Sequence, residues 1–89
     1  MSKARYYVSV PKNVARAIKR YPANDRAAIF HAIENLGDNP RSPGCAKLRV
    51  SDLGEYRIKV RGYRIRYDVD DQEKVVYILA VKLRGEAYK

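Results

Sequence analysis

The stretch YRIKVRGYRIRY, residues 56–67, decides the fold of this chain. Apolar and charged side chains alternate on both sides of Arg61-Gly62, a dipeptide that suits a two-residue hairpin turn. With that turn, Val60 faces Tyr63 and the pairing continues outward to residues 56 and 67. All apolar side chains then lie on one face of the hairpin and all cations on the other. A slip by one residue would pair apolar with charged positions throughout, so the pattern predicts this register.

Outward from the hairpin, the sequence predicts one α+β domain that spans residues 1–89. Residues 5–10 and 74–81 are rich in β-branched and aromatic side chains, as strands are, and residues 55–60 and 63–69 are the arms of the hairpin. The expected order is strand, helix, helix, strand, strand, strand. Both alternating sets of residues 75–81 are apolar, which is typical of a strand with a neighbour on each side. We therefore expect a mostly antiparallel four-stranded sheet with two helices packed on one face.

The two helices are expected between the first strand and residue 37. Pro11 suits a helix start and Pro22 a helix end, and Gly37 suits the end of the second helix. The second helix is expected to begin near Asn24 or Asp25, either of which could cap it. A short connection makes the two helices an antiparallel pair. The apolar positions that define their faces are Val14, Ala17, Ile18 and Tyr21 in the first helix and Ile29, Ile33 and Leu36 in the second.

Composition favours a polyanionic partner and excludes several other classes of protein. The chain carries 19 Lys and Arg against 10 Asp and Glu, a formal net charge of +9 on 89 residues, as nucleic-acid-binding proteins often do. It has neither a signal-peptide pattern nor an apolar run long enough to cross a bilayer, which indicates a cytoplasmic protein that binds no membrane. With one Cys, Cys45, and one His, His31, it cannot assemble a Cys/His zinc site, and we expect neither a metal nor a cofactor.

Like charges face each other across the predicted hairpin. Lys59 is opposite Arg64 and Arg57 is opposite Arg66, and such pairs destabilise a sheet. A solvated surface would explain one basic strand, but two adjacent strands with cations in register favour a face that binds phosphates. If the last strand stays extended, Lys82 and Arg84 continue on the face of Arg64.

Arginine, lysine and tyrosine can suffice to cleave RNA. The attacking 2′-hydroxyl is part of the substrate, so a protein need only position it, take its proton, neutralise the phosphorane and protonate the leaving 5′ oxygen. Clustered cations favour a tyrosine phenolate, which makes Tyr88 a candidate base. Packing of Tyr88 on the core is an equally good interpretation of the sequence alone.

Residues 56–88, YRIKVRGYRIRYDVDDQEKVVYILAVKLRGEAY, resemble the RelE toxins of the RelE/ParE toxin–antitoxin superfamily, and AKLR at 46–49 matches the family's lead-in to the second strand. The resemblance implies a RelE-like fold and ribosome-dependent cleavage of A-site mRNA that leaves a 2′,3′-cyclic phosphate. It also implies inhibition of translation and neutralisation by a RelB-like antitoxin.

Family roles carry over to matching positions of this chain. Arg57 and Lys59 would hold phosphate and help polarise the nucleophile, and Arg64 would stabilise the transition state. Arg84 would stabilise charge or the leaving group, and Tyr88 would act as the base or stack on a nucleotide. The further residues expected to bind RNA are Arg61, Arg66, Lys82, Lys47 and Arg49.

Two departures from the family pattern matter. Lys82 and Leu83 stand where relatives often have Gly followed by His or Lys, so proton transfer falls to Arg84, Tyr88 or Lys82. The chain also stops at Lys89, without the short C-terminal helix of many members. A ParE-like toxin that poisons DNA gyrase and an inactive antitoxin-binding homologue remain as alternatives.

Overall fold

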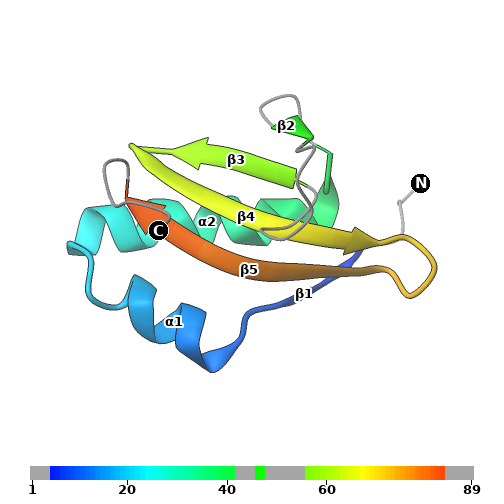
Figure 1. The fold of residues 1–89 in the computed structure, drawn as a ribbon, viewed down its shortest axis with the longest axis horizontal. Coiled ribbons are helices and arrows are strands. Elements are labelled where there is room, and N and C mark those ends of the chain that lie inside the picture. Colours follow the sequence, from blue (N-terminus) through cyan, green and yellow to red (C-terminus); the bar gives the residue numbers. More distant parts are fainter. Residues whose placement is uncertain (1–4, 42–45, 48–55, 84–89) are drawn as a thin grey trace.

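The structure is a computed structural model, and it describes residues 5–41, 46–47 and 56–83. Its elements follow the predicted order with one addition, a short second strand (Figure 1). The elements are β1 Tyr7–Ser9, α1 Lys12–Ile18, α2 Ala23–Asp38, β2 Ala46–Lys47, β3 Tyr56–Val60, β4 Tyr63–Asp70 and β5 Val75–Leu83.

The described strands form one mixed sheet in the order β1-β5-β4-β3-β2. β1 is parallel to β5, and the other neighbours are antiparallel. The four expected strands are therefore present, and β5 has a neighbour on each side, as its two apolar faces predicted. The addition is β2, two residues that pair with Tyr56 and Arg57 at the far edge. Two residues are too few to show a strand's alternation, so the sequence pattern did not reveal it.

The hairpin of β3 and β4 has the predicted register in all five residue pairs, from Val60 opposite Tyr63 to Tyr56 opposite Tyr67. Arg61 and Gly62 form the turn with positive φ angles of 49° and 84°. A left-handed backbone at both central residues is what a two-residue hairpin turn needs to match the twist of its strands. The alternation around Arg61-Gly62 is therefore confirmed as the local signal for this hairpin.

Each helix begins directly after a proline. The backbone is extended at Pro11 and Pro22, and their carbonyls accept the first helical hydrogen bonds, from Ala15 N at 3.0 Å and Arg26 N at 2.8 Å. The prediction that Asn24 or Asp25 caps α2 was wrong, since the helix begins at Ala23 and no side chain caps it.

The predicted end of α2 at Gly37 was also wrong, because the helix continues through Asp38 and Gly37 is buried inside it. Gly37 instead allows a close approach of the chain's beginning. Its carbonyl accepts a hydrogen bond from Tyr6 N at 2.8 Å, and a Cβ at this position would lie 2.6 Å from the Arg5 guanidinium. The Arg5 side chain also donates to the Glu34 carbonyl. The Arg5 guanidinium therefore occupies the space that a side chain at position 37 would take.

Both helices cover one face of the sheet, and they run in opposite directions in Figure 1. α1 packs mainly on β5, whereas α2 packs on β1, β5 and β3. One apolar core joins the two layers. Its buried members are Val14, Ile18, Ile29, Ile33, Leu36, Tyr56, Ile58, Tyr63, Ile65, Tyr67, Val76, Ile78 and Val81. Within the described residues, no helix is long and apolar enough to span a membrane. The cations of β3 and β4 lie on the opposite face of the sheet.

Candidate functional site

Three cations from three strands form one row on the sheet face that lies away from the helices. Lys59 of β3 is opposite Arg64 of β4, and Arg64 is opposite Lys82 of β5. We call these three residues the cationic row. Lys59 and Lys82 are exposed, and Arg64 is half-buried between them. Since paired strands lie about 4.8 Å apart, the row spans about 10 Å across the sheet.

Lys82 joins the row because β5 contains a bulge. Tyr67 pairs with Ile78 while its neighbour Arg66 pairs with Ala80, so Leu79 is an extra residue in the register. Strict alternation from Val76 and Ile78 would have put Lys82 on the core face. The extra residue reverses the alternation and turns Lys82 toward the face of Arg64. The expected placement of Lys82 beside Arg64 is confirmed, and the bulge is its physical cause.

A second cationic pair lies one step further along the strands. Arg57 is opposite Arg66, as predicted, and Arg66 is opposite Ala80. Arg57 is half-buried, but Arg66 is only 8% exposed. Arg66 was expected to bind RNA, and its burial makes it the least accessible cation of this face.

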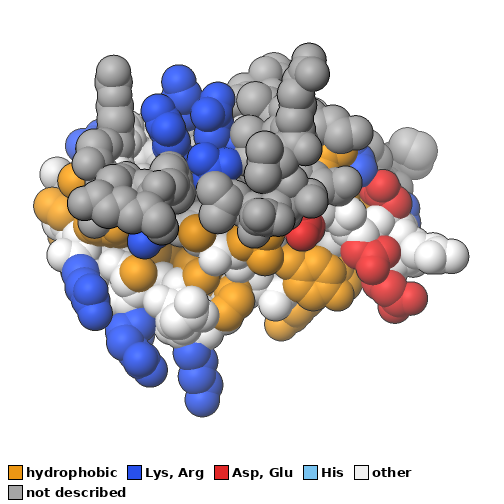
Figure 2. All heavy atoms as spheres, viewed as in Figure 1, with side chains coloured by type: hydrophobic (Ala, Val, Ile, Leu, Met, Phe, Trp, Pro, Cys, Tyr) orange, Lys and Arg blue, Asp and Glu red, His pale blue; other side chains and the backbone are white. Residues whose placement is uncertain are grey.

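Charge is unevenly distributed over the molecule. Lys and Arg side chains gather over β3, and Asp and Glu side chains gather at the β4–β5 turn (Figure 2). A hollow of about 260 Å³ lies at the end of the β3–β4 hairpin, lined by Lys59, Gly62, Tyr63 and Arg64. An arginine offers paired donors that match a phosphate, and an ammonium beside it adds a point charge. The hollow can therefore hold one phosphate group between two cations of the row.

Arg61 turns away from the cationic row and toward the helices. Its Nε donates to Asp25 Oδ1 at 2.8 Å, and the Tyr63 hydroxyl donates to Asp25 Oδ2 at 2.9 Å. The hydrogen bond from Arg61, followed by that from Tyr63, lowers the pKa of Asp25. Arg61 was expected to bind RNA, whereas in this structure its guanidinium is held by a carboxylate on the other side of the sheet.

Tyr63 lines the hollow but is poorly suited to act as a base. Burial, and next the hydrogen bond to Asp25, raises the pKa of its phenol to about 12. Its ring packs on Tyr21, with 4.5 Å between the ring centroids. A phenolate at this position would therefore be rare near neutral pH.

Several predicted site residues cannot be placed. Arg84, Tyr88 and Arg49 lie outside the described residues, so their proposed roles stay predictions. Lys47 belongs to β2, and its backbone pairs with Tyr56 at the sheet edge.

A second network joins three segments at the other end of the sheet. The Asp71 carboxylate of the β4–β5 turn accepts hydrogen bonds from Tyr6 at 2.6 Å and from Arg41 at 3.0 and 2.8 Å. The bonds from Arg41, and next that from Tyr6, lower the pKa of Asp71 to about 2. Asp71 therefore joins the β4–β5 turn to Tyr6 and to Arg41. His31 is exposed on α2.

The contact of Asp25 with the hairpin could not be predicted from the sequence because its partners lie 36 and 38 residues away in the chain. No local pattern distinguishes it from an ordinary acidic residue in the first turn of a helix. The β5 bulge has no local signal either, because both faces of that strand are apolar. Only the packed sheet shows both features.

Comparison with known proteins places the chain in a family. Residues 8–88 match the family described as the ParE toxin of type II toxin–antitoxin systems. No curated protein sequence matches the chain.

Solved structures share the fold. The archaeal RelE–RelB complex from Pyrococcus horikoshii OT3 has a chain 28% identical to this one, with a TM-score of 0.80 over 93% of this chain and 99% of that one. The toxin–antitoxin complex RelBE2 from Mycobacterium tuberculosis gives 27% identity and a TM-score of 0.76, covering 90% of this chain and 99% of its own. The isolated E. coli RelE toxin is 24% identical, with a TM-score of 0.74 over 93% of this chain and 88% of that one. This match shows a likeness of fold. The chain therefore belongs to the RelE/ParE superfamily, as a toxin of a type II toxin–antitoxin system.

Proposed function

We propose that this toxin is a ribosome-dependent, metal-independent endoribonuclease, folded as one domain over residues 1–89, that cleaves mRNA in the ribosomal A site. The cationic row carries the proposal, because three strands present Lys59, Arg64 and Lys82 side by side on the face opposite the helices. Cations that face each other oppose folding, so a polyanionic ligand offers the best physical account of their placement. The likeness to RelE toxins supports RNA as that ligand.

The proposed reaction needs no cofactor. The 2′-oxygen attacks the adjacent phosphorus, the P–O5′ bond breaks, and the products are a 2′,3′-cyclic phosphate and a 5′-hydroxyl. Arg64 neutralises the phosphorane while Arg57 and Lys59 hold the phosphate and orient the nucleophile. The resemblance to the family assigns Tyr88 as acceptor of the 2′ proton and Arg84 to charge on the leaving oxygen. Lys82, beside Arg64, can donate the proton that the leaving oxygen requires.

Expression in growing cells tests this proposal. Arg64→Ala should relieve growth arrest, with cleavage reduced about 100-fold or more, because one charge-stabilising donor is lost. Tyr88→Phe should relieve it as well if Tyr88 is the base. Primer extension on mRNA from induced cells should map cuts that follow the reading frame. The RNase assignment is wrong if both variants arrest growth like the wild type, and brisk cleavage of free RNA would contradict the requirement for a ribosome.

The family match supports a second candidate function. Residues 8–88 match a family described by its ParE toxin, so a ParE-like toxin that poisons DNA gyrase is the alternative. Induced cells would then show DNA damage and relaxation defects while mRNA stays intact. An inactive homologue that only binds antitoxin would cause neither mRNA cleavage nor DNA damage in induced cells.

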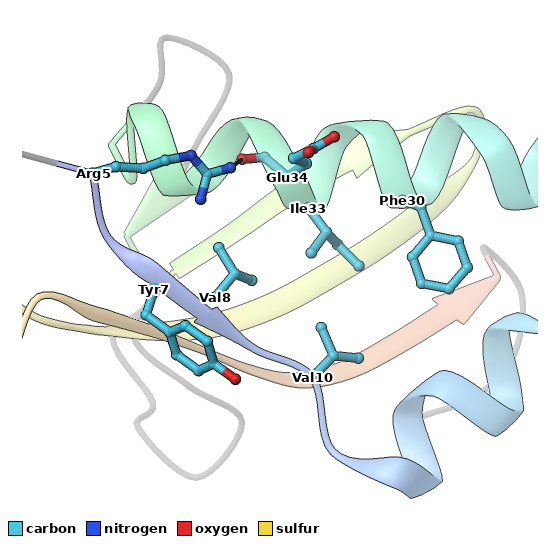
Figure 3. Close-up of a pocket in the computed structure, with 7 residues that line it drawn as sticks. All are labelled: Arg5, Tyr7, Val8, Val10, Phe30, Ile33 and Glu34. Atoms are coloured by element: carbon cyan, nitrogen blue, oxygen red, sulfur yellow. Dashed lines mark hydrogen bonds between the residues drawn. The ribbon is translucent and has the colours of Figure 1, made fainter.

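We further propose that a RelB-like antitoxin neutralises the chain through a groove between β1 and α2. The groove has a volume of about 420 Å³. In Figure 3, Val8 and Val10 point toward Phe30 and Ile33 of α2, while Tyr7 points away. The lining residues are Arg5, Tyr7, Val8, Val10, Phe30, Ile33 and Glu34.

The occupant we expect is an extended, acidic segment of the antitoxin. β1 is the terminal strand of the described sheet and pairs only with β5. The Tyr7 amide donates to the Lys74 carbonyl next to β5, so the peptide groups of Val8 point away from β5, to the free edge of β1. An added strand can bind this edge, and the net charge of +9 favours an acidic partner.

Phe30→Asp tests the groove, because Phe30 is 39% exposed and its replacement should leave the fold intact. The variant should remain toxic but escape neutralisation by the product of the adjacent small reading frame. Full neutralisation of Phe30→Asp, or failure of the wild type to co-purify with that product, would contradict the proposal.

A further inference from the structure

The β3–β4 turn that carries the cationic row is held from the helix side of the sheet. Arg61 has a left-handed backbone, which is unfavourable for a residue with a side chain, and Gly62 has no atom within 4 Å of a virtual Cβ. Gly62 therefore serves the turn through its backbone freedom alone. Arg61 and its neighbour Tyr63 join the turn to α2 through hydrogen bonds to Asp25.

Asp25 binds this turn at two points. One carboxylate oxygen accepts from Arg61 at 2.8 Å and the other accepts from Tyr63 at 2.9 Å. The Asp25 side chain is only 22% exposed, and its bond from Tyr63 is partly buried, whereas the Arg61 side chain is 55% exposed and solvent reaches its bond. Since Asp25 lies in the first turn of α2, the pair of bonds joins the tip of the hairpin to the longest helix. We call Asp25, Arg61 and Tyr63 the turn clamp.

The clamp lies directly behind the proposed phosphate site. Tyr63 belongs to the clamp and also lines the hollow with Lys59 and Arg64. Arg64 follows Tyr63 in the chain, and its side chain points to the opposite face. Repulsion within the cationic row pushes the strand ends apart, and the clamp opposes that movement at the hairpin tip.

We propose that Asp25 is a positioning residue for the cationic row, holding the β3–β4 turn so that Lys59 and Arg64 keep the spacing that grips a phosphate. The inference rests on the proposed nuclease function, since it assigns Asp25 a part in that site. Asp25 itself touches neither substrate nor reacting atoms; it acts through Arg61 and Tyr63.

The second network of the molecule provides a matched control. Asp71, like Asp25, accepts hydrogen bonds from one tyrosine hydroxyl and one arginine guanidinium, but at the opposite end of the sheet. Asp25→Asn and Asp71→Asn therefore remove the same charge from the same kind of cluster. Asp25→Asn should lower kcat for ribosome-dependent cleavage about 10-fold with KM for ribosomes within about 2-fold, because misplaced groups slow the chemical step. Asp71→Asn should leave kcat unchanged even if it melts at a lower temperature.

A double-mutant cycle separates positioning from direct RNA contact. If Arg61 acts only through Asp25, then Arg61→Gln should lower kcat as Asp25→Asn does, and the double variant should be no slower than either. Additive losses would mean that Arg61 contacts RNA itself and would overturn the clamp. An unchanged kcat in Asp25→Asn, or an equal loss in Asp71→Asn, would also overturn it.

Hydrogen exchange keeps the inference separate from the nuclease proposal. Amides of residues 60–64 should exchange faster in Asp25→Asn than in the wild type, and at the wild-type rate in Asp71→Asn. If the wild type cleaves no mRNA, the nuclease proposal fails while this measurement still decides whether Asp25 holds the turn. Equal exchange rates at residues 60–64 in all three proteins would refute the positioning role.

Discussion

Replacing Arg64 by Gln is expected to stabilise the fold while it removes activity. Arg64 lies between Lys59 and Lys82, so it takes part in two like-charge contacts. Two unit charges about 5.5 Å apart in water repel each other by about 0.75 kcal/mol. At 0.15 M salt, where the Debye length is about 8 Å, screening halves this to about 0.4 kcal/mol.

The expected gain for Arg64→Gln is the sum of its two contacts, about 0.8 kcal/mol in the free energy of unfolding. For a domain of this size that corresponds to a rise in Tm of roughly 3–6 °C. Lys59→Gln and Lys82→Gln each remove one contact of the row, so each should give about half of this gain. The 2:1:1 ratio of the gains expected for Arg64→Gln, Lys59→Gln and Lys82→Gln follows from the strand order, which gives Arg64 two cationic neighbours and each lysine one.

Thermal unfolding followed by circular dichroism at 0.15 and 0.5 M NaCl provides the assay. At 0.5 M the Debye length is about 4 Å, so the gain for Arg64→Gln should shrink to about 0.4 kcal/mol. Arg20→Gln, which removes an exposed cation distant in sequence from the row, serves as the control and should change little. A lower Tm for Arg64→Gln, or a gain in stability that is the same at 0.15 and 0.5 M NaCl, would refute the idea that the row destabilises the fold.

Two further predictions concern the end of the sheet away from the hairpin tip. The buried Tyr67 hydroxyl donates to the Pro40 carbonyl at 2.6 Å, so Tyr67→Phe should lower the free energy of unfolding in urea by about 1–3 kcal/mol; a neutral substitution would show that this bond contributes nothing. Asp71 has a pKa of about 2 in the folded protein, below its ordinary value of 3.8. Its stabilising effect is therefore full above the ordinary pKa and is lost as the pH falls toward 2. Urea titrations should show Asp71→Asn less stable than the wild type at pH 6, with the difference vanishing near pH 2, and a pH-independent difference would contradict this linkage.

Local features of the sequence were sufficient to predict most of the fold. The order of the main elements, the hairpin register and the apolar face of each helix all depend on neighbours within a few residues. The helix boundaries were less predictable because Gly37 is a common helix terminator, yet here a helix passes through it. The Arg5 guanidinium and the Tyr6 amide, more than 30 residues earlier in the chain, contact that position.

The pairing at the middle of the candidate site was predictable from the sequence, but the accessibility of the surrounding arginines was not. Alternation along β3 and β4 brought Lys59 opposite Arg64, and the structure confirms that contact. The expected RNA contacts included Arg61 and Arg66, but Arg61 is bound to Asp25 and Arg66 is 8% exposed. Alternation predicts which face a residue lies on, whereas accessibility depends on what else packs there.

By itself, the sequence determined the hairpin and its two faces, because a two-residue turn and period-two alternation are local constraints. Lys82 was predicted on the face of Arg64, but only the tertiary structure shows how it reaches the row, through the extra residue Leu79 that reverses the alternation of β5 where it pairs with β4. Only the tertiary structure, too, brought Asp25 to the hairpin tip. The bulge in β5 and the position of Asp25 both depend on contacts between separate segments of the chain. These contacts form only when the strands pair and the helices pack on the sheet.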